Sequence, residues 1–133
     1  MQSEIDFGHA LLAHYHDAGE GFGHRQHLHA SWSFLRAYGA ADGAEATVRF
    51  LRRVAAHEGA PEKYNETLTR FWIDAVRLAD AAAGTPPTFE DVIAAEPHLL
   101  DRHLALGHWS PERLWSNEAR LGRVEPDLRA VEA

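Results

Sequence analysis

The fold is decided by the stretch YNETLTRFWIDAVRLADAA, residues 64–82. Wound into an α-helix at about 3.6 residues per turn, this stretch carries apolar side chains over most of its circumference. Only Arg70, Asp74 and Arg77 mark a narrow polar face. A helix with so wide an apolar surface packs against neighbours on more than one side. We therefore expect the longest helix of the chain here, beginning near Pro61 and lying at the centre of a bundle.

Apolar residues recur at helical spacing on both sides of this stretch, and glycines and prolines interrupt them. The helices expected before it cover residues 3–17, 23–38 and 42–58. After a break at residues 84–87, only short helices are expected, and no segment alternates with period two for long enough to form a strand. The sequence therefore predicts an all-α, single-domain bundle of about four main helices. Residues 1–84 would form the main bundle, and residues 85–133 would pack over it as short helices and loops and close the mouth of a site.

Composition excludes several classes of function. The 133 residues are 45% hydrophobic and 25% charged, which is typical of one soluble globular domain. Because there is no cysteine, the chain has no disulfide, no thiolate nucleophile and no sulfur ligand for zinc. A formal charge of −7 argues against a nucleic-acid partner. No apolar run approaches the ~20 residues of a membrane span, and the N-terminal stretch lacks a signal-peptide pattern, so we expect a soluble, cytoplasmic protein without a membrane partner.

Two short segments place polar, reactive side chains where the helices should bury apolar ones. They are FGHRQHL at residues 22–28 and KYNETLT at residues 63–69. On a helix, His24 falls in line with an apolar stripe, and His27 lies on the flank of the same stripe. Buried imidazoles are costly unless their nitrogens have partners. We therefore expect a polar pocket between the second and fourth long helices.

These segments, with the Ser-Trp pair at residues 31–32, are followed by further motifs in the C-terminal third. The motifs are PHLLD at 97–101, WSPERL at 109–114, SNEAR at 116–120 and EPDL at 125–128. Together the pattern FxHxxHL…SW, KYxETxT, WSPExL, SxEAR and PDL resembles a family of small bacterial all-helical proteins that are mostly described as hypothetical. The resemblance covers residues 22–128 and implies a helical fold without a settled activity. In that family the position of Asn65 is usually His, and an amide is a poor ligand for zinc or iron, so this departure counts against a metal site here.

The first hypothesis is a metal-dependent enzyme. His24 and His27 can present nitrogens to one divalent ion, zinc or iron, and Glu66 would complete a two-histidine, one-carboxylate set with open positions. Glu66 and Tyr64 are the candidate catalytic residues. The side chains expected to orient a small-molecule substrate are Asn65, Thr69, Trp32 and Trp72.

The second hypothesis is a metal-free enzyme or ligand-binding pocket. Glu66 would orient His24 or His27 as a general base, and Tyr64 or Thr69 would donate hydrogen bonds. Trp32 and Trp72 would wall an apolar cavity around a small molecule.

The third hypothesis is an interaction module or a homodimer without catalytic activity. His24 would then donate to a backbone carbonyl near the glycine-rich entry to its helix, and His27 would pair with Glu66 in a buried structural network. The chain is an enzyme under the first hypothesis, an enzyme or a binding protein under the second, and neither under the third.

Overall fold

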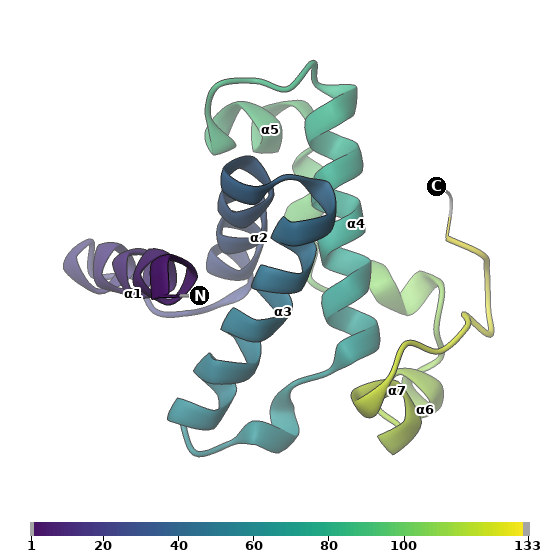
Figure 1. Cartoon of the computed structure of the whole chain (residues 1–133). Coiled ribbons are helices and arrows are strands. Elements are labelled where there is room, and N and C mark those ends of the chain that lie inside the picture. The colour runs from purple at the N-terminus through teal and green to yellow at the C-terminus, as the bar shows by residue number, and fades with distance from the viewer. Residues whose placement is uncertain (1, 132–133) are drawn as a thin grey trace.

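Five helices of seven residues or more carry the fold of the computed structural model, which describes residues 2–131 (Figure 1). They are α1 (Gln2–Asp17), α2 (His24–Tyr38), α3 (Ala40–His57), α4 (Glu66–Ala82) and α5 (Phe89–Ala95). Shorter turns complete the chain: η1 (Pro61–Lys63), η2 (Pro97–Leu100), η3 (Leu104–Gly107), α6 (Pro111–Leu114) and α7 (Asn117–Leu121). The described residues contain no strand, so the all-α prediction is confirmed. The predicted segments 1–84 and 85–133 include Met1 and residues 132–133, which lie outside the described range.

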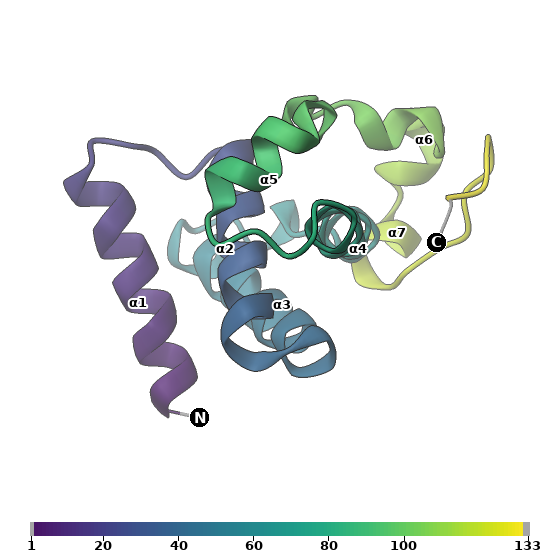
Figure 2. The same ribbon diagram turned by 90° about the horizontal axis from the view of Figure 1, so that it is seen from above.

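Helices α2, α3, α5, α6 and α7 lie around α4. In Figure 1, α2 and α3 lie on one side of α4 while α6 and α7 lie on the other, and α5 crosses near its C-terminal end. Viewed from above, with α4 end-on, α1 runs along the outer edge of the molecule beyond α2 and α3 (Figure 2). The central place expected for α4 is therefore present, but the expectation that it is the longest helix is wrong, because α3 has 18 residues and α4 has 17. No helix within residues 2–131 has the length and apolar character needed to cross a membrane.

Two glycines bring α2 and α3 together. Gly39 ends α2 and precedes α3 with φ +89°, a conformation that glycine adopts without steric cost. At Gly43 a Cβ atom would lie 2.6 Å from the carbonyl oxygen of Phe34, so the two helix backbones are in direct contact there. Because of this turn, α3 begins at Ala40, two residues earlier than the expected start at position 42.

The buried apolar residues form two clusters. The smaller one lies between α1, α2 and α3, around Phe34 and Phe50. The larger one contains twelve buried residues, and seven of them come from residues 89–114, among them Trp109 at 1% exposure. The segment after α4 therefore completes the main core as well as packing over the bundle.

The first turn of α4 anchors the irregular C-terminal segment. The Nδ2 of Asn65 donates to the Leu114 carbonyl oxygen at 2.8 Å. The hydroxyl of Thr67 donates to the Gly122 carbonyl oxygen at 3.0 Å and accepts from the backbone N–H of Val124 at 3.1 Å. Two side chains of α4 thus bind backbone groups at three points of a segment that has little regular structure.

Candidate functional site

A cavity of about 470 Å³ opens between α2, α3, the start of α4 and the segment from η2 to α6. Its walls are mainly apolar and include Leu51, Val54, Leu68, Trp72 and Leu106. This volume and composition are typical of small-molecule sites, which measure roughly 300–1,000 Å³ and combine apolar walls with a few polar groups. The cavity lies where the sequence predicts a polar pocket, but its walls are mainly apolar, and α3 and the C-terminal segment form part of them.

Six of the eight site residues predicted from the sequence line this cavity. They are His24, His27, Tyr64, Asn65, Thr69 and Trp72. The other two, Glu66 and Trp32, are not part of the lining. The indole N–H of Trp32 donates to a carboxylate oxygen of Asp80 at 3.0 Å, which fixes this ring against α4, away from the cavity.

His24 is fixed by a hydrogen bond to the C-terminal segment. Its Nε2 lies 2.8 Å from the Leu99 carbonyl oxygen. A carbonyl only accepts, so Nε2 carries the proton, and in the neutral ring Nδ1 is left as a bare acceptor. Burial, reinforced by the nearby charge of Arg102, lowers the pKa of His24 despite this bond, which favours the neutral ring. The carbonyl expected as its partner is present, although it belongs to η2 and not to the entry of α2.

His27 has no hydrogen-bond partner within residues 2–131. Its ring packs against Phe22 with a centroid distance of 4.6 Å and lines the cavity. Burial, together with the neighbouring His24, lowers the pKa of His27 to about 4. The ring is therefore neutral at physiological pH and keeps one donor and one acceptor nitrogen unpaired. The pairing of His27 with Glu66 that the third hypothesis expects is not formed.

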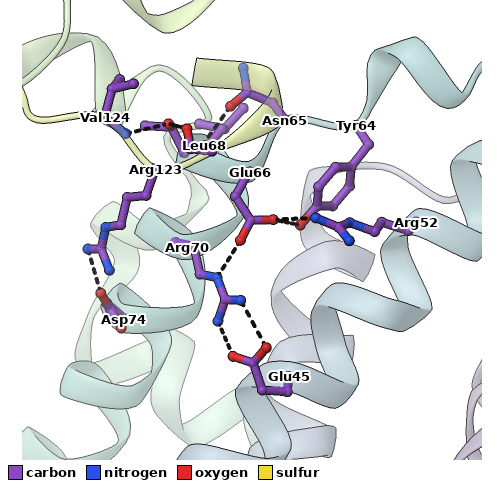
Figure 3. Close-up of polar contacts among 12 residues, drawn as sticks. Glu45, Arg52, Tyr64, Asn65, Glu66, Leu68, Arg70, Asp74, Arg123 and Val124 are labelled. Atoms are coloured by element: carbon purple, nitrogen blue, oxygen red, sulfur yellow. Dashed lines mark hydrogen bonds and ion pairs between the residues drawn. The ribbon is translucent and has the colours of Figure 1, made fainter. Parts of the chain in front are cut away.

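Glu66 is instead the centre of a polar cluster between α4 and α3 (Figure 3). Its carboxylate accepts from the Tyr64 hydroxyl at 2.7 Å, from Arg70 Nε at 2.8 Å and from Arg52 Nη2 at 3.2 Å. Arg70 also binds both carboxylate oxygens of Glu45, at 2.6 and 3.1 Å. Burial raises the pKa of Glu66, but the hydrogen bonds from Tyr64 and Arg70 outweigh it and the net shift is downward. Glu66 is therefore ionised and fully engaged with α3 and α4.

Tyr64 lies where the cluster and the cavity meet. Burial, and then its hydrogen bond to Glu66, raise the pKa of Tyr64, while the nearby Thr69 hydroxyl opposes that shift. The phenol therefore keeps its proton and donates it to Glu66, so its hydroxyl is engaged in a structural bond although its ring faces the cavity.

Asn65 lines the cavity, but its amide is engaged in structural bonds. Its Oδ1 accepts from the backbone N–H of Leu68 at 3.0 Å, which makes it the N-cap of α4. Its Nδ2 binds Leu114, and the residue is only 5% exposed. These two bonds explain why α4 begins at Glu66, while Pro61 opens the separate turn η1.

The metal set predicted from the sequence is not brought together. The Glu66 carboxylate is engaged outside the cavity lining, and within residues 2–131 no three His, Asp or Glu side chains are grouped so that they could hold a metal ion. His24 and His27 would supply two nitrogens, and any further ligands would come from water or a bound molecule. Metal binding remains a prediction.

The cavity also includes charged residues that the sequence did not single out as site residues. Lys63, Arg102 and Glu58 line it. Lys63 belongs to the second polar segment, residues 63–69, so the sequence pattern offered a reason to include it among the site residues. Arg102 lies in the turn between η2 and η3, and only the packing of that turn brings it to the cavity. Exposed Trp115 also contributes to the lining, at 55% exposure.

Comparisons of this chain with protein-family models, curated proteins and solved structures found no match. The family resemblance seen in the sequence therefore remains an expectation. Function is inferred from the geometry of the cavity.

Proposed function

We propose that this protein binds a small organic molecule in the cavity between α2, α3 and α4, with His27 as the polar group that recognises it. One observation carries the proposal: a partly buried, neutral imidazole without a hydrogen-bond partner faces an apolar cavity of ligand size. Within residues 2–131 the fully buried, unpaired side-chain atom is Nη2 of Arg53, so the ring nitrogens of His27 are open to the cavity, where a polar group of a ligand can pair with them. The neutral ring can therefore donate one hydrogen bond to a ligand and accept another from it.

The protonation of the two histidines favours binding over acid–base catalysis. A general base works best when its pKa lies near the working pH, whereas the pKa of His27 is about 4. Glu66, the predicted partner of a catalytic histidine, is bound instead to Tyr64, Arg52 and Arg70. A neutral donor–acceptor ring suits recognition of a hydroxyl, amide or carboxylate group.

A metal-assisted form of this function is the second candidate. The observation that favours it is the bond from His24 Nε2 to the Leu99 carbonyl, because metal-bound histidines are commonly oriented by such a bond through their other nitrogen. His24 and His27 would hold a zinc or iron ion together with atoms of the bound molecule.

The test is a fragment screen by NMR on the whole chain, followed by dissociation constants for a matched pair of variants. His27→Leu removes both ring nitrogens with modest loss of bulk, and His29→Leu does the same on the same helix outside the cavity, where His29 Nδ1 is bonded to the Tyr15 hydroxyl. We expect fragments to shift amide signals of the cavity and to lose at least tenfold in affinity, about 1.4 kcal/mol, only in His27→Leu.

Equal affinities in the wild type and both variants would contradict the role of His27. A screen without any fragment that shifts cavity signals would contradict the binding function. Repeating the screen with added zinc or iron(II) tests the second candidate, since a metal held by the two histidines would tighten binding in the wild type and not in a folded His24→Ala/His27→Ala variant.

A further inference from the structure

Cationic side chains of this protein are mostly neutralised by carboxylates. Seven of the thirteen Lys and Arg side chains form ion pairs with Asp or Glu. Arg113 and Arg120 donate instead to backbone carbonyl oxygens. The chain has twenty acidic residues for these thirteen bases, so an unpaired cation is not explained by a shortage of acids.

Two of the remaining cations lie at the cavity. Lys63, at the end of η1, and Arg102, between η2 and η3, both line it, and neither has a hydrogen bond or ion pair from its side chain within the part of the chain that the structure describes. Both are exposed, which places their charges at the rim. Arg102 is near enough to His24 for its charge to add to the effect of burial on that ring. Arg77 and Arg129, whose side chains also form no hydrogen bond or ion pair within residues 2–131, are not part of this lining.

The interior of the cavity contrasts with this rim. The polar side chains below it are uncharged, and most are already bonded: Ser31 donates to the His27 carbonyl oxygen, and Tyr64 donates to Glu66. Trp72 and Leu68 provide apolar wall on α4. A molecule that filled this space would therefore be largely apolar inside, with any charge at the mouth.

We infer that the ligand is an organic anion, with an apolar body against Trp72 and Leu68 and an acidic group, such as a carboxylate, between Lys63 and Arg102. This inference rests on the proposed binding function and names its ligand class. Guanidinium binds a carboxylate through two parallel hydrogen bonds, and ammonium adds a compact second charge. A neutral or cationic molecule with the same body would leave both cations unpaired.

Substitution of Glu58 should change the affinity for an anionic ligand in the opposite direction. It is the one carboxylate residue in the described lining, at the C-terminal end of α3, and no ion pair is formed by it. Its negative charge opposes an anionic ligand, so the rim has two favourable charges and one unfavourable one. Loss of the Glu58 charge should therefore strengthen binding of the anionic ligand, whereas loss of the Lys63 or Arg102 charge should weaken it.

The experiment compares three probes with one aromatic body: 2-naphthylacetate, 2-naphthylacetamide and 2-(2-naphthyl)ethylamine. Dissociation constants are measured by NMR titration at low salt on the full chain. We expect the acetate to bind about tenfold more tightly than the amide, and the amine to bind most weakly. Lys63→Gln and Arg102→Gln should each reduce that preference several-fold, Glu58→Gln should increase it, and Arg77→Gln, an unpaired cation outside the cavity, should leave it unchanged.

The outcomes separate this inference from the function on which it rests. If the amide or the amine binds as tightly as the acetate at the cavity, or if Arg77→Gln lowers the preference as much as Arg102→Gln, the anionic class is wrong while the binding function stands. If none of the three probes shifts cavity signals up to millimolar concentration, the anionic class is wrong, and the fragment screen decides the binding function separately.

Discussion

The segment of residues 63–69 sends polar side chains to two regions that differ in how fully they are paired. Toward α3, the Glu66 carboxylate accepts three hydrogen bonds, and Arg70 bridges it to Glu45 (Figure 3). Toward the cavity, the side chain of Lys63 has no hydrogen-bond or ion-pair partner in residues 2–131, and neither has that of His27 on α2. The hydrogen bonds of the Glu66 cluster are therefore explained by the fold alone, whereas the unpaired groups at the cavity are the basis of the proposed binding function.

The largest effect is expected at Asn65, the cavity-lining residue between Tyr64 and Glu66 in the chain. Asn65→Ala removes the N-cap of α4, worth about 1 kcal/mol, and leaves the buried Leu114 carbonyl without its donor, which costs about 1–2 kcal/mol more. We expect the free energy of unfolding, measured by urea denaturation, to fall by about 2–3 kcal/mol. Asn65→Ser keeps a capping oxygen and should lose only part of this amount. Equal losses in both variants would show that the cap contributes nothing.

A smaller effect on stability should follow from Glu66→Gln. The amide keeps the shape of the side chain but loses the charge that attracts Arg70 and Arg52, so we expect a loss of about 1–2 kcal/mol in urea denaturation. Affinity for a cavity ligand should stay unchanged, because Glu66 is outside the lining. Glu45→Gln, at the exposed end of the same cluster, should cost about 0.5 kcal/mol. A drop in ligand affinity that matched the loss of stability would mean that the two regions act as one.

The smallest effect concerns pH and His27. Its folded pKa, about 4, lies below the ordinary histidine value of 6.5, so the unfolded chain binds more protons between these values. The contribution of His27 is therefore fully present above pH 6.5 and is lost as pH falls toward 4. We expect wild-type protein to lose about 1 kcal/mol more than His27→Gln between pH 7 and pH 5, since water in the cavity screens the charge. Parallel urea midpoints for both proteins across this range would refute the burial of a neutral ring.

The long helices could be predicted from local features of the sequence. Apolar spacing, with glycine and proline at the breaks, was sufficient to predict the four main helices and the all-α class. The start of α4 differs from the expectation because Asn65 is held at the N-cap position by a bond to Leu114, far away in the sequence. A proline such as Pro61 is compatible with the first turn of a helix or with a separate 3₁₀ turn, and nothing local distinguishes the two.

The residues of the candidate site could be predicted from the sequence only in part. His24 and His27 were found because they interrupt an apolar stripe, which is a property of one helix. Glu66 lies at the edge of the apolar surface of α4, where a small rotation decides its direction. Arg52 of α3 and Arg70 of α4 bind its carboxylate away from the cavity. Arg102 lies outside any periodic element, so its place at the cavity depends on tertiary packing.

The attachment of the C-terminal segment to α4 has a consequence for how this protein can vary. Asn65 and Thr67 bind only backbone groups there, at Leu114, Gly122 and Val124. Apart from Trp115 at the cavity and Arg123, which pairs with Asp74, the exposed side chains between these anchor points can therefore change with little cost, whereas their spacing along the chain cannot. One inserted or deleted residue would move an anchor out of register and leave the partner hydroxyl or amide unmatched. Over evolutionary time the length of this segment should be conserved more strictly than its amino-acid sequence.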